Sequence, residues 1–133
     1  MPYQAKTLSI TIDRPWQEVY EAIWRPLEFP RWASGLSAAG LRFDGEEWRA
    51  TGPGGPVMLR FTDHNRFGVM DHSVHLQSGM VIHVPMRVCA NGSGAEVMLT
   101  LFRPGNASED AFEHDANWVR RDLARLRDML EEN

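Results

Sequence analysis

The sequence has 133 residues, a length that suits one domain and is too short for two, so we assign residues 1–133 to a single domain. Its net charge of −4, with no basic stripe, argues against nucleic-acid binding, and no apolar run approaches the ~20 residues of a membrane span. The single cysteine, Cys89, excludes an internal disulfide and indicates a reducing compartment. Because the N-terminus shows no signal-peptide pattern, we expect a cytoplasmic protein.

The N-terminal third predicts a strand followed by two short helices. Residues 7–12 alternate between apolar and polar side chains, as in a half-buried strand. Asp13 is a candidate N-cap for the helix that follows. The apolar residues of that helix fall at helical spacing and are Trp16, Val19, Tyr20, Ile23 and Trp24. Pro26 interrupts the pattern, and a shorter second helix should carry Phe29 and Trp32.

Turn signals divide residues 41–102 into about six short strands. Asp44 and Gly45 form a two-residue hairpin turn, which would place Leu41 opposite Trp48. The segment 52–56 is rich in glycine and proline, and we interpret it as a loop. It lacks the lysine and the helix start of a phosphate-binding loop, so it does not indicate a nucleotide site.

The later turns set the registers of the central strands. A turn at His64 and Asn65 would set Leu59 opposite Met70. Turns at 77–79 and 91–94 predict the pairs Val74–Ile82, His72–Val84, Met70–Met86, Val88–Val97 and Met86–Leu99.

These registers sort the side chains into two faces. The apolar face holds Leu41, Trp48, Ala50, Val57, Leu59, Phe61, Met70, Val74, Ile82, Val84, Met86, Val88, Val97, Leu99 and Leu101. The opposite face holds mostly charged and polar residues, together with Cys89, to which we assign a structural role. The pattern predicts a curved antiparallel sheet of about seven strands with one wet face. Pro85 cannot donate to a ladder and should mark a bulge.

The C-terminal segment predicts one long helix. Ser108 is a good N-cap, and the helix should run for about 23 residues, or about 34 Å. Its apolar stripe consists of Phe112, Ala116, Val119, Leu123, Leu126 and Leu130. Asp122 and Asp128 alternate with arginines, which indicates a solvated face. Trp118 lies on the flank of the stripe, where core packing is the commoner role and a homodimer contact is the alternative.

This α+β layout resembles the helix-grip fold of the START/Bet v 1-like (SRPBCC) superfamily, in its uncharacterised bacterial polyketide cyclase/dehydrase and lipid-transport-like branch. The resemblance rests on residues 10–24, Pro30-Arg31-Trp32, and the segments 67–72, 84–88 and 96–104. It implies a curved sheet wrapped around the C-terminal helix, with an elongated apolar cavity between them. Many members of the superfamily bind lipids, hormones or aromatic polyketides in that cavity. Fold does not imply function, so the site needs its own argument.

The predicted inner wall supplies a candidate ligand cavity, because such sites are mostly apolar with a few orienting polar groups. The alternative is that these side chains simply fill the core. The residues that we predict to line the cavity are Trp32, Trp48, Leu59, Phe61, Met70, His72, Val84, Met86, Leu99, Val119 and Leu123.

His72 is the titratable residue that the registers place inside the wall. We expect it to orient a ligand; the alternatives are a general acid/base in a cyclase- or dehydratase-type reaction and a buried histidine satisfied by the protein. Catalysis usually needs a second positioned group, and no strand supplies an inward acid or base, so binding is favoured. A protein-interaction module is the third class.

No cofactor is indicated, and we expect no metal. His72 and His75 point to opposite faces of a strand and cannot chelate together. Asp71, His75 and His83 could cluster on the wet face, but a surface polar cluster is the commoner outcome.

Overall fold

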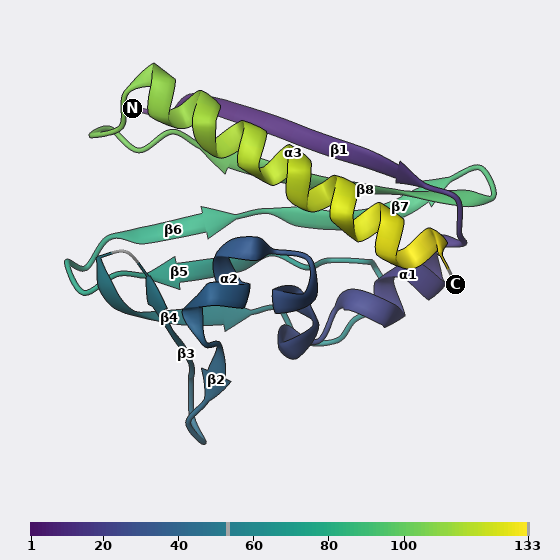
Figure 1. The fold of residues 1–133 in the computed structure, drawn as a ribbon, viewed down its shortest axis with the longest axis horizontal. Coiled ribbons are helices and arrows are strands. Elements are labelled where there is room, and N and C mark those ends of the chain that lie inside the picture. The colour runs from purple at the N-terminus through teal and green to yellow at the C-terminus, as the bar shows by residue number, and fades with distance from the viewer. Residues whose placement is uncertain (53, 133) are drawn as a thin grey trace.

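The computed structural model describes residues 1–52 and 54–132, and for residues 37–39 the backbone alone (Figure 1). In chain order the elements are β1 (Ala5–Ile12), α1 (Trp16–Ile23), the 3-10 helix η1 (Pro26–Arg31), α2 (Ser34–Ala39), β2 (Arg42–Phe43), β3 (Trp48–Gly52), β4 (Gly55–Phe61), β5 (His72–His75), β6 (Val81–Val84), β7 (Met86–Asn91), β8 (Gly94–Phe102) and α3 (Glu109–Glu131). The predicted second helix corresponds to η1, which carries Phe29 but ends before Trp32, and α2 was not expected.

The strands form two antiparallel ladders that meet at Pro85. One ladder has the order β1-β8-β7 and the other β2-β3-β4-β5-β6. β6 and β7 are one run of chain interrupted by Pro85, and the Met70 N–H donates to the Met86 carbonyl at 2.8 Å across the junction. Counted with β6 and β7 as one, the sheet has the seven strands expected, and the break at Pro85 follows from its missing N–H.

The Asp71 carboxylate holds this junction together on the outer face of the sheet. It accepts hydrogen bonds from the Met86 N–H at 2.8 Å and from the Arg87 guanidinium at 2.8 and 3.0 Å. The bond with Arg87, together with that from the Met86 N–H, holds the pKa of Asp71 below its usual range. A side chain thus satisfies the backbone donor that the interrupted ladder leaves free.

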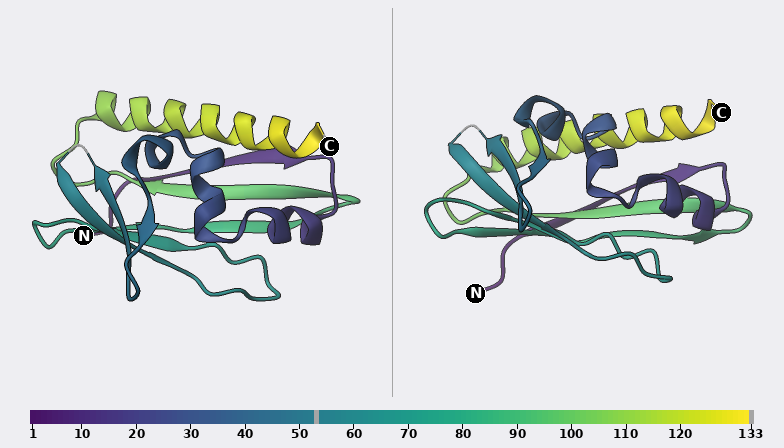
Figure 2. Two further views of the ribbon diagram at one scale, coloured as in Figure 1. Left: turned by 60° about the horizontal axis from the view of Figure 1, so that its bottom comes forward. Right: turned by 90° about the horizontal axis from the view of Figure 1, so that it is seen from below.

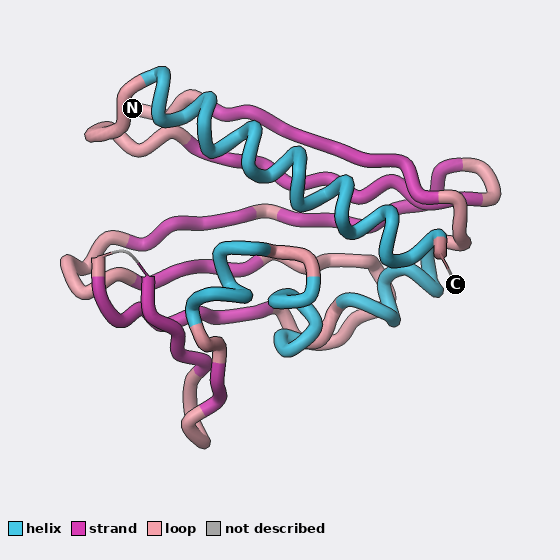
Figure 3. Tube along the Cα trace, in the orientation of Figure 1, coloured by secondary structure: helices cyan, strands magenta, loops and turns pink. Residues whose placement is uncertain are grey.

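All the helices lie on the same side of the sheet. Figure 2 shows α3 running along that side, with α1, η1 and α2 beside it over the other strands, and Figure 3 shows the same division in cyan and magenta. The core fills the space between these layers and includes Ile12, Val19, Ile23, Phe29, Met86, Val88, Val97, Leu123 and Leu126. The expectation of one apolar and one wet face is confirmed.

Two of the predicted turns are wrong in register. Phe43, rather than Leu41, pairs with Trp48, because the Asp44 carboxylate accepts the Glu46 and Glu47 N–H groups and widens the turn. The shift is two residues. An even shift leaves every side chain on its predicted face.

The loop before β5 is also wider than predicted. Leu59 pairs with Val74 instead of Met70, a shift of four residues. Asn65 organises this loop: its Oδ1 accepts the N–H groups of Phe67 and Val69, and its Nδ2 donates to the Val69 carbonyl at 3.0 Å. The pairs predicted from the two later turns are confirmed, including Val74–Ile82 and Met86–Leu99.

Of the two predicted helix N-caps, the one at Ser108 is confirmed and the one at Asp13 is wrong. Ser108 caps α3 as predicted, since its Oγ accepts the Ala111 N–H at 3.0 Å, and α3 has the expected 23 residues. Asp13 does not cap α1; Pro15 occupies that position, and the Asp13 N–H donates to the Glu131 carboxylate instead. In the predicted 52–56 loop, β3 and β4 continue until Gly52 pairs with Gly55, and Pro53 lies outside the described residues.

Gly68 should be the glycine least able to accept a side chain. Its φ is +72°, and an added Cβ would lie 2.1 Å from the Val88 carbonyl oxygen. Gly92 has a similar φ of +59° and open space around its Cα, which makes it a matched control. We expect Gly92→Ala to lower the free energy of unfolding by about 1 kcal/mol, and Gly68→Ala by at least about 2 kcal/mol more, because the backbone must also move. Urea unfolding measures both, and equal losses would contradict the clash.

Candidate functional site

A cavity of about 290 Å³ lies between the sheet, α3 and the η1–α2 segment. Its lining from the sheet is Leu59, His72, Val74, Val84, Leu99 and Leu101, and from the helices Phe29, Trp32, Ala33, Gly35, Leu36, Trp118, Val119 and Asp122. An apolar cavity of about 150 Å³ is known to hold benzene. This cavity therefore has room for a ligand of about two fused rings.

Six of the residues predicted to line a cavity lie along this one. They are Trp32, Leu59, His72, Val84, Leu99 and Val119. Met70, Met86 and Leu123 are fully buried and belong to the core instead. For them, the alternative of simple core packing is correct.

Trp48 and Phe61 line a neighbouring groove of about 420 Å³ rather than the cavity. The two hollows are separated by a group of packed rings. Phe61 stacks on His72 with ring centroids 5.7 Å apart, and Phe29 contacts both rings at 4.9 and 5.2 Å. This aromatic partition places Phe61 at the boundary.

His72 has a fixed tautomer in this wall. Its Nδ1 lies 3.1 Å from the Met70 carbonyl, which can only accept, so Nδ1 carries the proton and Nε2 is left as an acceptor. Within the described part of the chain, no residue hydrogen-bonds to Nε2. Burial lowers the pKa of the imidazole below its ordinary value, so the ring is neutral at pH 7.

Trp32 contributes a donor without an acceptor. The residue is 2% exposed, and its Nε1 is buried with no hydrogen-bond partner among the described residues. An unsatisfied buried donor is unfavourable by about 1–3 kcal/mol. The cavity wall therefore combines apolar surface with one unpaired acceptor, the Nε2 of His72, whereas the Trp32 Nε1 is covered by protein.

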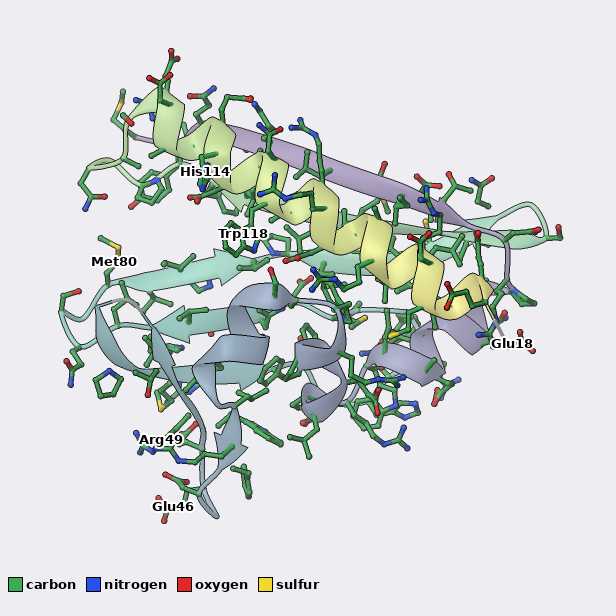
Figure 4. All side chains as sticks on the ribbon, in the orientation of Figure 1. Glu18, Glu46, Arg49, Met80, His114 and Trp118 are labelled. Carbon is green, nitrogen blue, oxygen red and sulfur yellow. The ribbon has the colours of Figure 1, made fainter. Side chains whose placement is uncertain are left out.

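A polar link joins α3 to α2 at the cavity. Asp122 accepts hydrogen bonds from the Ser34 hydroxyl at 2.9 Å and from the Ser34 N–H at 3.3 Å. The Trp118 Nε1 donates to the same Ser34 oxygen at 2.6 Å. Figure 4 shows the Trp118 side chain leaving α3 on the side that faces β6.

Asp122 corrects the sequence interpretation, because it is 7% exposed and does not lie on a solvated helix face. A signal was present: Asp122 stands three residues after Val119 and four before Leu126, within the apolar stripe. Trp118, 42% exposed, lies at the flank as predicted.

The outer face offers less chemistry. The Asp71 carboxylate is occupied by Arg87 and the Met86 N–H, and the Ser73 hydroxyl lies 2.9 Å from the His75 Nε2. Among the described residues, no three side chains of metal-ligating type gather into a site. Cys89 is exposed and unpaired. Across the same residues, no helix has the length and apolar character to cross a membrane.

The lowered pKa of His72 predicts a pH-dependent stability. The unfolded chain takes up this proton at a higher pH than the folded protein does. The free energy of unfolding should therefore fall as the pH drops from about 7 to about 5. His72→Gln removes the titrating group, so its stability should fall less over that interval.

Urea unfolding at the two pH values measures this difference. His83 is exposed and lies on β6, where it pairs with Ser73 of β5. His83→Gln therefore controls for the loss of a histidine as such. A decline in His72→Gln as steep as in the unsubstituted protein would contradict the assignment of a neutral buried imidazole.

Comparisons with known proteins bear on the fold. No protein-family model matches the sequence, and no curated protein matches it. Among solved structures, DynU16 from the dynemicin biosynthetic locus aligns with a TM-score of 0.68 at 18% identity over 98% of this chain. That alignment covers 48% of DynU16, so this chain spans about half its length.

Two further structures match over nearly their whole length. Ara h 8.0201 aligns with a TM-score of 0.64 at 11% identity, covering 98% of this chain and 99% of that one. The Aha1 dimer from Colwellia psychrerythraea aligns with a TM-score of 0.70 at 14% identity, covering 96% of both chains. At these identities the likeness concerns the fold. The chain has the helix-grip fold of START/Bet v 1-like proteins, as the sequence indicated.

Proposed function

We propose that this protein binds a hydrophobic or aromatic small molecule, of lipid or polyketide type, in the cavity between the sheet and α3. The observation that carries the proposal is the composition of the cavity wall. Apolar side chains make up most of it, and His72 offers one unpaired hydrogen-bonding atom, its Nε2. A pocket with a few polar groups on an apolar surface is the usual form of a small-molecule site.

The polar atoms suggest how a ligand would be oriented. The His72 Nε2 would accept a hydrogen bond from a ligand hydroxyl or amine. Because the His72 tautomer is fixed by Met70, the acceptor is held in place before the ligand arrives.

A second candidate function is an enzyme of cyclase or dehydratase type. The unpaired Nε2 of a neutral His72 favours it, since a general base needs a free lone pair. The buried Asp122 carboxylate lines the same cavity and supplies the second titratable group that the strands lack. Turnover that disappears in His72→Gln and survives in His83→Gln would support this candidate.

We extend the proposal to the cellular location and the oligomeric state of the protein. The cytoplasm suits a protein whose one cysteine is unpaired. A homodimer stays a prediction.

Binding can be tested with 2-naphthylmethanol, a neutral probe of two fused rings. By isothermal titration calorimetry we expect a dissociation constant between about 40 µM and about 2 mM, given about 0.3–0.5 kcal/mol for each of its roughly 12 heavy atoms. Val84→Phe should abolish this binding, because residue 84 lines the cavity and the larger ring would fill it.

Val81→Phe is the matched control. It lies on the same strand, is 39% exposed and does not line the cavity. Circular dichroism melting curves verify that both variants are folded. Absence of probe binding to the unsubstituted protein, or its loss in Val81→Phe alone, would contradict the proposed cavity.

A further inference from the structure

Asp122 is the single charged side chain among the described residues that line the cavity, apart from the titratable His72. The other lining residues are apolar or uncharged. With a neutral imidazole, the cavity wall carries one negative charge and no positive one. A wall of this kind favours a cationic ligand and disfavours an anionic one.

Within the part of the chain that the structure describes, the charge of Asp122 has no counter-ion. Among the described residues, no lysine, arginine or histidine lies within ion-pair distance of its carboxylate. The neighbouring Arg121 makes no ion pair with Asp122, and its guanidinium lies 5.8 Å from the Trp118 ring centre. Arg125 is exposed to water. A buried carboxylate is poorly accommodated without a counter-charge, and hydrogen bonds offset this only in part.

The hydrogen bonds that link α2 to α3 do not explain why residue 122 is negatively charged. The Ser34 N–H belongs to the first turn of α2, where the preceding residue, Ala33, provides no side-chain cap. An asparagine at position 122 would also accept the Ser34 N–H with its Oδ1, although its Nδ2 would replace the oxygen that accepts the Ser34 hydroxyl. The bond to the helix start therefore needs an acceptor but not a negative charge.

We infer that the ligand of this cavity is an organic amine that is protonated at neutral pH, and that Asp122 selects it by pairing with the ammonium group. The inference rests on the proposed binding function and adds the charge of the ligand. The aromatic rings of Phe29, Trp32 and Trp118 on the same wall suit such a ligand, because ring faces attract cations and pack on an aromatic body.

Three probes with one ring system separate charge from shape. They are 2-naphthylmethylamine, which is cationic at pH 7, the neutral 2-naphthylmethanol, and the anionic 2-naphthoate. By calorimetry, the amine should bind about tenfold more tightly than the alcohol, as expected for one charged hydrogen bond. The naphthoate should bind more weakly than the alcohol.

Asp122→Asn removes the charge and keeps an acceptor for Ser34. In this variant the amine and the alcohol should bind within about threefold of each other. Asp128→Asn makes the same change in net charge at an exposed position of α3 and should keep the preference for the amine. Asp122→Glu restores the charge and should restore the preference at least in part.

The outcomes distinguish this inference from the proposed function. If the alcohol binds and the amine gains nothing over it, the inference is overturned and the binding function stands. An amine preference that persists in Asp122→Asn, or that also disappears in Asp128→Asn, overturns it too. If no probe binds, the proposed function fails. Should Asp122→Asn not fold, the order of the three probes on the unsubstituted protein still decides.

Discussion

The packing of α3 against β1 and β8 is the constraint on which the site depends. α3 covers only one half of the inner face of the sheet. The other half, formed by β4, β5 and β6, is covered by η1 and α2 (Figure 1). The cavity is the space left where these two covers meet over the sheet. The hydrogen bonds between Asp122 and Ser34 hold the covers together at that place.

The fold could be predicted from the sequence because an error of an even number of residues in a strand register leaves each side chain on the same face of the sheet. Leu59 pairs four residues away from its expected partner, and Phe61 on the same strand shifts with it, yet both still face inward. The alternation of apolar residues and the cap at Ser108 are local signals. They survive errors in turn length, which is why the layout could be predicted.

The site itself was only half predictable. The alternation of side chains along the strand places Met70 and His72 on the same wall. It does not show that Met70 is covered by other side chains while His72 lines the cavity. That difference depends on how far each helix lies above the sheet. Asp122 was missed because its charge suggested water, although its position in the helical stripe indicated burial.

Pro85 has a consequence for the cavity wall. Each ladder keeps its own hydrogen bonds, and the Met70 N–H, the Val88 N–H and the Asp71 carboxylate join the two ladders across the junction. Val84, in β6, belongs to one ladder, and Leu99 and Leu101, in β8, belong to the other. These side chains line one cavity, so its wall is built from both ladders and the seam at Pro85 runs through it.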